Sequence, residues 1–370
     1  MNINLVTNVD GSGYGIVGLN ILKSLDALGH DVVFFPRVVW RTTDLAPDLS
    51  DVALILRCMR RHHDIDMAAP CLRISPEAEM TLFAGRGPRC GLSFFETTRF
   101  TDRELRHLGS VDLLFVASEW ARSVAIDNGL AAAAVFVAPM GVDREVFHET
   151  APRKDGPTVF VNVGAWQYRK GHDLLLEAFG RAFRPGDDVE LRLQCHNPWS
   201  SIDDERWLQC CRESPMAGHI TVLPRTARHR EIADVLRDAD CGVFPSRGEA
   251  WNLEALEMLS CGRHVIATRY AGHTEYLDPG NASLIEIDEL EPVDDPIWMP
   301  VFSEHKVGDW ARLGDHQLEQ LVQHLRAVHE RKQSGALGLN CAGVATAERF
   351  TWAHTARRLV AGFESLGGAE

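Results

Sequence analysis

The feature that most constrains the fold is an alternation of short apolar runs with amphipathic stretches, which occurs twice along the 370 residues. Short apolar runs bounded by turn residues are typical of buried strands, and apolar side chains spaced three and four apart are typical of helices. Strands that alternate with helices form parallel sheets, because each parallel connection needs a crossover. We therefore predict an α/β fold with two Rossmann-like, doubly wound domains.

The first repeat of this alternation occupies residues 1–150, which we assign to an N-terminal domain. A helix is predicted over 16–28, because Val17, Ile21 and Leu25 fall on one face, and another begins at Ser118. The strand-like runs are 3–7, 31–35, 52–56, 89–94, 113–117 and 135–138. The polar, turn-rich residues 149–157 are interpreted as the linker.

The second repeat occupies residues 151–349, which we assign to a C-terminal domain. Its predicted strands are 159–163, 190–194, 220–223, 241–244 and 264–267. Its predicted helices are 173–183, 231–237, 253–261 and 315–330, and a last helix lies within residues 350–370. Residues 286–309 are acidic and lack a clear period, so we expect a loop there.

Composition narrows the class of protein. The formal net charge is −14, which disfavours nucleic acid and anionic membranes as partners. No apolar run reaches the roughly 18 residues that span a bilayer, and the N-terminal run reads as a strand rather than a signal peptide. The nine cysteines form no C-x-x-C pair, which favours reduced thiols and a cytoplasmic protein.

The most informative segment is residues 245–257, which follow a predicted strand and open a helix. Free backbone amides at a helix start suit a phosphate oxygen. Glu249 lies in the turn and Glu257 within the helix, and carboxylates accept well from sugar hydroxyls. The spacing alone leaves a second interpretation open, in which Glu249 offsets the helix dipole and Glu257 is a surface residue.

Two other strand-to-helix turns carry candidate ligand-binding residues. Arg169 and Lys170 stand beside a glycine after the strand 159–163, where two cations would suit a diphosphate, although a solvated turn fits equally well. The first turn contains Gly13 within Gly-Ser-Gly-Tyr-Gly. This is not a G-x-G-x-x-G sequence, so NAD is not expected, but a close approach of ligand to backbone is.

Together these segments resemble the family 4 retaining glycosyltransferases of the GT-B fold. Glu249 and Glu257 fit the E-x₇-E signature of that family, and residues 164–179 resemble its G-x₅-K-G-x-D-x-L-L-x-A-F segment. Residues 116–120, 139–147 and 350–352 resemble its interdomain segments and the start of its terminal helix, which crosses back to the N-terminal domain. Each match is modest, but five in the right order are specific.

The resemblance implies a role for each of these residues. Lys170, with Arg169, would neutralise the diphosphate of a nucleotide sugar as the bond to the sugar breaks. Glu257 would hold the ribose and Glu249 the transferred sugar. The amides of Asn252 and Leu253 would meet phosphate or sugar oxygens. The charge carried by lysine and arginine implies that no metal and no other cofactor is required. Retention would follow a front-face path in which the leaving phosphate helps to deprotonate the acceptor.

Several positions depart from the family pattern or remain open. Ala165 stands where many members have arginine, and Arg169 is the candidate replacement. Arg225 follows a strand expected near the base, and Glu96 is the candidate contact for the acceptor or the sugar, with a structural carboxylate as the alternative. The predicted acceptor is a soluble small molecule or glycan. Two rival functions remain: a nucleotide-sugar epimerase of the same fold, and a non-catalytic sugar- or nucleotide-binding subunit.

Overall fold

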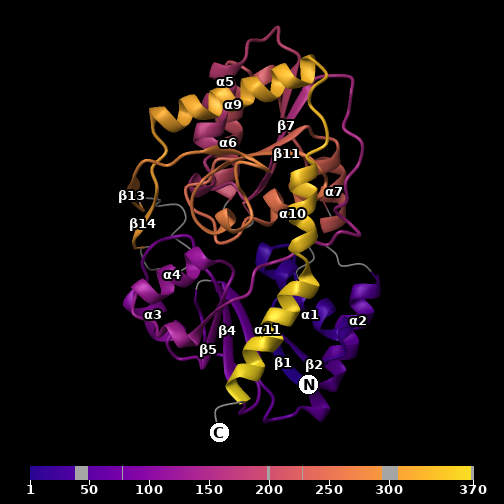
Figure 1. The fold of residues 1–370 in the computed structure, drawn as a ribbon, viewed down its shortest axis with the longest axis vertical. Helices are drawn as coiled ribbons and strands as arrows, with labels where there is room; N and C mark the ends of the chain where they lie inside the picture. The colour runs from indigo at the N-terminus through magenta and orange to yellow at the C-terminus, as the bar shows by residue number, and fades with distance from the viewer. Residues whose placement is uncertain (38–48, 77, 198–200, 227, 294–306, 368–370) are drawn as a thin grey trace. The chain divides into compact units, whose positions relative to one another are not determined.

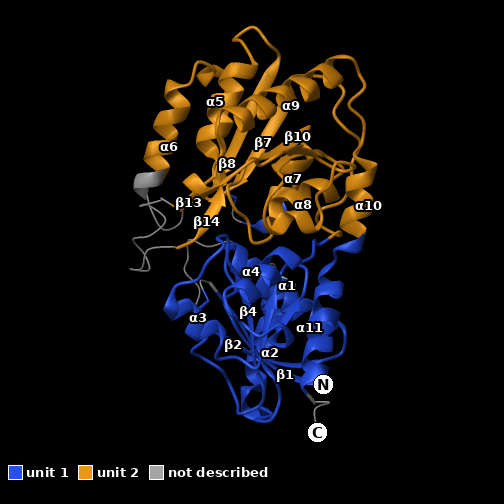
Figure 2. Cartoon of the chain, turned by 60° about the vertical axis from the view of Figure 1, so that its left-hand side comes forward, with its two compact units in different colours: residues 1–143, 226–231, 349–370 blue, residues 144–225, 232–348 orange. Residues whose placement is uncertain are grey.

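The computed structural model describes residues 1–37, 49–76, 78–197, 201–226, 228–293 and 307–367. The chain divides into two compact units (Figure 2). Unit 1 comprises residues 1–143, 226–231 and 349–370, and unit 2 comprises residues 144–225 and 232–348. The strand alternation predicted from the sequence therefore appears as two separate sheets, one in each unit.

Unit 1 contains a parallel sheet of six strands in the order β2-β1-β3-β4-β5-β6. The strands are β1 Asn2–Thr7, β2 Asp31–Pro36, β3 Cys71–Pro76, β4 Arg89–Phe94, β5 Leu113–Val116 and β6 Val135–Val137. The helices are α1 Gly13–Ala27, α2 Leu49–Arg60, α3 Asp102–Leu108, α4 Glu119–Asp127 and α11 Trp352–Gly367. As predicted, Ser118 caps α4 by accepting a hydrogen bond from the Ala121 amide.

One predicted strand of unit 1 is wrong, and one observed strand was not predicted. Residues 52–56 lie inside helix α2 (Figure 1) rather than in a strand. Ile55 and Cys58 are buried three residues apart while Leu56 between them is 45% exposed, which is the period of a helix. The strand paired with β1 is instead β3, whose apolar pattern is interrupted by the buried Arg73.

The last helix, α11, packs against strands β5 and β6 of the sheet of unit 1. The Phe363 ring contacts the Phe115 ring of β5 edge-to-face at a centroid distance of 5.6 Å. Arg358 lies over the Phe136 ring of β6 and donates to the Val137 carbonyl. Helix α10 (Cys341–Arg349), which precedes it, lies mostly in unit 2. The C-terminal segment thus contributes helices to both units.

Unit 2 contains a second parallel sheet, in the order β12-β11-β10-β7-β8-β9. Its strands are β7 Thr158–Gly164, β8 Val189–Cys195, β9 Ile220–Val222, β10 Cys241–Phe244, β11 His264–Thr268 and β12 Ser283–Ile285. Its other helices are α5 His172–Ala182, α6 Ser201–Glu213, α7 His229–Arg237 (mostly in this unit), α8 Leu253–Ser260 and α9 Asp315–Gln333. The expected loop 286–309 contains one short strand, β13 Leu290–Pro292, which pairs with β14 Asp309–Ala311 at the loop's end, and residues 294–306 lie outside the described residues.

Helices cover both faces of the second sheet. Alternate residues of a strand point to opposite faces. Val243 of β10 belongs to the apolar core that includes residues of α5 and α9, whereas Gly242 faces Met258 of α8. Helix α8 therefore lies on the face opposite α5 and α9. Because every side chain of β10 is buried, the strand is central, and the loop that follows it emerges at the middle of the sheet edge.

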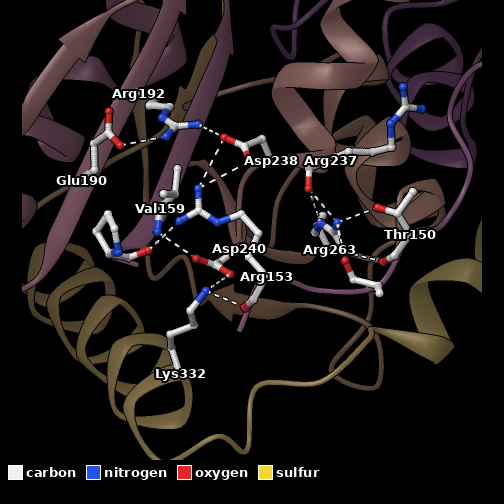
Figure 3. Close-up of polar contacts among 12 residues, drawn as sticks. Thr150, Arg153, Val159, Glu190, Arg192, Arg237, Asp238, Asp240, Arg263 and Lys332 are labelled. Atoms are coloured by element: carbon white, nitrogen blue, oxygen red, sulfur yellow. Dashed lines mark hydrogen bonds and ion pairs between the residues drawn. The ribbon is translucent and has the colours of Figure 1, made fainter. Parts of the chain in front are cut away.

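The segment predicted as a linker is held to unit 2 by buried charges (Figure 3). Arg263 donates to the carbonyl and hydroxyl oxygens of Thr150 at 2.8 and 2.7 Å. Lys332 donates to the Arg153 carbonyl at 2.8 Å and pairs with Asp240 at 2.7 Å. Asp240 also accepts from the Val159 amide at 2.9 Å. These contacts fix where the chain enters β7.

Candidate functional site

The candidate site lies in unit 2, where the loops after β7 and β10 meet. The two strands are neighbours, with Cys241 paired to Phe160 and Gly242 to Val161, so both loops leave the same edge of the sheet. Gly171 has φ +73°, and a Cβ there would lie 1.9 Å from the Pro245 carbonyl oxygen. Glycine is required at this position both for the backbone conformation and for the close approach of the two loops.

A buried arginine links the two loops. Arg247 pairs with both oxygens of the Asp173 carboxylate at 2.9 and 2.7 Å, and its guanidinium lies 3.7 Å from the centre of the Tyr168 ring. Its backbone amide donates to the Arg169 carbonyl at 2.7 Å. A bidentate pair with a stacked ring fixes geometry as well as charge. We infer that Arg247 holds the turn at Tyr168–Lys170 in one orientation against the loop after β10.

The turn between β7 and α5 presents two cations to one carboxylate. Lys170 Nζ lies 2.8 Å from Glu249 Oε1, and Arg169 Nη1 lies 3.1 Å from Glu249 Oε2. The Ser246 hydroxyl donates to Glu249 Oε1 at 2.8 Å. All four residues are buried, at 9% exposure or less. The structure thus brings together the three residues predicted as catalytic, and adds Ser246.

Both partners of the Lys170–Glu249 pair are charged at neutral pH. Burial raises the pKa of the Glu249 carboxyl, but attraction to Lys170 and Arg169 outweighs burial and lowers this pKa to about 2. Burial likewise lowers the pKa of the Lys170 ammonium, yet Glu249 and Glu254 together raise it above its ordinary value. The site therefore holds two permanent cations at the carboxyl end of a parallel sheet, where such folds bind ligands.

Helix α8 begins beside this cluster with a strained residue. Asn252 has φ +70° and ψ +80°, and its side-chain oxygen accepts from the Ala255 amide at 3.1 Å. Helix geometry leaves the amides of Leu253 and Glu254 without partners inside the helix. Within the part of the chain that the structure describes, the buried Asn252 Nδ2 has no hydrogen-bond partner. The helix start therefore offers donors to an anion, and the left-handed backbone of Asn252 is strained.

Glu257, the second acidic residue of the predicted signature, lies on α8 and is 4% exposed. The Tyr276 hydroxyl donates to the Asn252 carbonyl at 2.5 Å. Burial raises the Tyr276 pKa well above its ordinary value, and the charges of Glu249, Glu254 and Glu257 raise it further. The surface alternative for Glu257 is therefore wrong, since its carboxylate is buried in the same neighbourhood as Glu249.

Sequence reasoning missed two further groups at this site. His273, in the turn after β11, donates from Nε2 to the Thr268 carbonyl at 2.5 Å, and burial lowers its pKa. Its Nδ1 has no partner among the described residues. Glu254, in the first turn of α8, lies near Lys170. An acidic residue in a first helical turn is common, so the sequence carried no distinct signal for Glu254. The signal available for His273 was its position in the short segment that follows β11 at the carboxyl edge of the sheet.

Three predicted site residues lie outside this cluster. Arg225 is exposed after β9, the edge strand, which β8 separates from β7. Gly13 is the first residue of α1 in unit 1, and a Cβ there would meet nothing within 4 Å. Glu96 follows β4 of unit 1 and is half-buried. The roles proposed for these three residues stay predictions.

The C-terminal half of the chain matches a known protein family. Residues 157–293 match the model of the family described as glycosyl transferases group 1. This range contains both loops of the site, with Lys170, Glu249 and Glu257. Among solved structures, sucrose-phosphate synthase from Thermosynechococcus elongatus aligns over the full length of both chains, with a TM-score of 0.71 and 15% identity. HepE from Anabaena, in complex with UDP-glucose, aligns over 99% of this chain and 100% of its own, with a TM-score of 0.66 and 14% identity.

Curated relatives are more similar to this chain in sequence than these solved structures are, but they match a shorter part of it. D-inositol 3-phosphate glycosyltransferase from Stackebrandtia nassauensis is 31% identical over 242 residues, 62% of this chain and 48% of the relative. The enzyme of the same name from Rhodococcus opacus is 28% identical over 271 residues, 71% of this chain and 51% of the relative. The matched region thus spans about half the length of these relatives. The predicted GT-B fold and the resemblance stated from the motifs are confirmed.

Proposed function

We propose, from the premise that this chain is a family 4 glycosyltransferase, that it moves a sugar from a nucleoside diphosphate to a hydroxyl group with retention of anomeric configuration. The observation that carries this proposal is the convergence of Lys170 and Arg169 on Glu249, beside the start of α8. Cations that stand ready where negative charge develops stabilise a departing diphosphate without reorganisation. We assign to Glu257, which is buried further along α8, the role of accepting hydrogen bonds from the ribose hydroxyls.

Glu249 is poorly suited to act as a nucleophile in this reaction. A carboxylate with a pKa of about 2, held by two cations and a hydroxyl, is a weak base. This supports the front-face path, in which the leaving phosphate accepts the acceptor proton and no glycosyl-enzyme bond forms. The role of Glu249 is then to orient the cations and the transferred sugar. NMR of the product tests the retention of configuration, since an inverted anomeric centre would contradict it.

The names of the relatives and the charge of this chain support a choice of donor and acceptor. HepE binds UDP and UDP-glucose in solved complexes, which makes a uridine nucleotide the first donor to test. The curated relatives are named for D-inositol 3-phosphate, which supports a small polyol as acceptor. We propose a soluble small-molecule or glycan acceptor rather than nucleic acid, because the net charge is −14. Among the described helices, none is long and apolar enough to cross a membrane.

We also propose that transfer needs no metal and takes place in the cytoplasm. The chain contains two D-x-D triplets, the usual metal anchor of the other major glycosyltransferase fold. In Asp238-Ala239-Asp240 both carboxylates pair with cations, Arg192 and Lys332. In Asp64-Ile65-Asp66, Asp66 accepts from Asn2 and Ala68. The nine cysteines are free, which supports a reducing compartment.

The experiment that tests this function is a thermal-shift panel of UDP, GDP, ADP and their sugars, followed by product analysis. A ligand at 100 times its dissociation constant stabilises the fold by about 2.7 kcal/mol. We expect one nucleoside diphosphate and its sugar to raise the melting temperature, and Lys170→Ala to abolish the shift. No shift with any member of the panel would contradict the proposal. Conversion of donor to an epimer without an acceptor would support the rival epimerase.

A further inference from the structure

A third carboxylate, Glu254, faces the same lysine as Glu249. It is the second residue of α8 and is half-buried. Gly164, the last residue of β7, has φ +150°, and a Cβ placed on it would lie 3.8 Å from Lys170 Nζ and 3.8 Å from Glu254 Oε1. The two side chains therefore approach the same point above the end of β7. The strand end needs glycine there, because its backbone conformation is one that other residues rarely adopt.

The two carboxylates near Lys170 are held very differently. Glu249 is buried and bound by Lys170, Arg169 and Ser246. Glu254 has no hydrogen-bond or ion-pair partner within 4 Å in the part of the chain that the structure describes. A carboxylate without such partners changes its rotamer at little cost, whereas Glu249 would have to break three contacts. Of the two, Glu254 is the one that an incoming anion can displace.

The charges at the site balance without a ligand. Lys170 and Arg169 supply two positive charges, and Glu249 and Glu254 supply two negative ones. A diphosphate that reaches Lys170 therefore brings its negative charge to a site that already holds a carboxylate, and the two repel each other. This repulsion acts on the nucleoside diphosphate product as well as on the donor, and product release limits turnover in many enzymes.

We propose that Glu254 competes with the diphosphate group for Lys170, and so sets how tightly the enzyme holds its nucleoside diphosphate product. The proposal rests on the proposed function. It assigns Glu254 a role distinct from Glu249: Glu249 orients the cations, and Glu254 weakens their hold on the leaving group. Removing the charge of Glu254 then strengthens binding of the diphosphate, while removing the charge of a remote glutamate does not.

The test compares Glu254→Gln with the wild type and with Glu177→Gln. Glu177 is exposed on α5, more than half of its side chain being accessible, and its substitution changes the net charge by the same amount. Calorimetry measures the dissociation constants of UDP and uridine, and of GDP or ADP with their nucleosides if those are the diphosphates that bind. We expect Glu254→Gln to tighten diphosphate binding about tenfold, or ~1.4 kcal/mol, with nucleoside binding and the Glu177→Gln protein unchanged.

Each other outcome has a defined meaning. Equal diphosphate affinity in wild type and Glu254→Gln, or weaker binding in the variant, overturns the proposal while leaving the glycosyltransferase function intact. A wild-type protein that binds no nucleoside diphosphate contradicts the proposed function itself. Glu254→Asp keeps the charge on a shorter side chain. An affinity between those of wild type and Glu254→Gln supports the proposal, and an affinity equal to that of Glu254→Gln contradicts the role of charge.

Discussion

Buried charged side chains lie near both ends of strand β10, but the groups that they bind differ. At the amino end, Asp240 pairs with Lys332 and accepts from a backbone amide, while Lys332 also donates to a backbone carbonyl (Figure 3). At the carboxyl end, Lys170 and Arg169 share the single carboxylate of Glu249, and Arg169 also donates to the Gly248 carbonyl, so Lys170 is the cation held there by a side chain rather than by the backbone. A backbone amide or carbonyl cannot move away from a charge without a change in the fold, whereas a side-chain partner can change its rotamer.

This difference separates a structural network from a candidate binding site. The amino-end contacts hold the chain as it enters β7, and a ligand could replace none of them without unfolding a strand. The carboxyl-end cations keep their charge and can exchange one anionic partner for another. Asn252 Nδ2, which lies beside them and has no hydrogen-bond partner among the described residues, also favours a binding site here. Substitutions at the two ends are therefore expected to affect different properties of the protein.

The largest effect is expected at the amino end. Asp240→Ala leaves the Lys332 ammonium buried without its counterion, which costs about 3–5 kcal/mol in cases of this kind. Denaturant unfolding should show this loss of stability, and transfer activity per folded molecule should be unchanged at low temperature. A loss below about 1 kcal/mol would mean that the network is not buried as described.

The next effect is expected at the carboxyl end, on catalysis. Lys170→Ala and Glu257→Ala each remove a proposed contact to the donor, and the loss of one charge-stabilising group costs about 10²–10³ in rate. Both proteins should remain folded by circular dichroism. Lys154→Ala, which removes an exposed lysine from the linker, is the matched control. Transfer at the wild-type rate in both variants would defeat the mechanism.

The contact between the two loops should be sensitive to a single methyl group. Gly171→Ala places a Cβ against the Pro245 carbonyl at a positive φ, and we expect a destabilisation of about 1–3 kcal/mol together with weaker donor binding. Gly186→Ala is the control, since a Cβ there meets nothing within 4 Å. Equal melting temperatures for the two variants would show that the loops separate readily.

The acid stability of the protein should report the Glu249 ion pairs. The folded pKa of Glu249 is lowered to about 2, so its ionisation stabilises the fold fully above its unfolded value of 4.5, and this stabilisation is lost as pH falls from 4.5 toward 2. Glu249→Gln should therefore show a shallower loss of stability over this range in urea unfolding. Parallel curves for the two proteins would argue against a paired, buried carboxylate.

The smallest effect is expected from removal of metal. Because we propose that Lys170 and Arg169 neutralise the diphosphate, transfer activity should be unchanged by a chelator such as EDTA. Loss of activity that magnesium or manganese restores would contradict this expectation and would direct attention to the D-x-D triplets.

The sequence predicted the architecture well where periodicity was strong. Strands 241–244 and 264–267 match β10 and β11 within one residue, because central parallel strands are uniformly apolar. It failed at residues 52–56, where a short apolar run within a helix resembles a strand. It also missed β3, because the buried Arg73 interrupts the apolar run and is neutralised by Glu79 only in the folded protein.

At the site, the sequence predicted the residue types but not their pairing. Lys170 and Glu249 each follow a predicted parallel strand, so both were expected at the carboxyl edge of one sheet. The link through Arg247 to Asp173 joins residues 74 positions apart, and no local pattern reports such a contact. Glu254 and Lys170 likewise lie far apart in the sequence, and their approach to one point beside Gly164 is visible only in three dimensions.

The most direct test of the central claim is a crystal structure of the protein with the nucleoside diphosphate that stabilises it. We predict that a diphosphate oxygen lies about 2.7–3.2 Å from Lys170 Nζ, beside Arg169 and the first amides of α8. Electron density for the diphosphate elsewhere, with the Lys170–Glu249 pair unchanged at its present distance, would contradict the account.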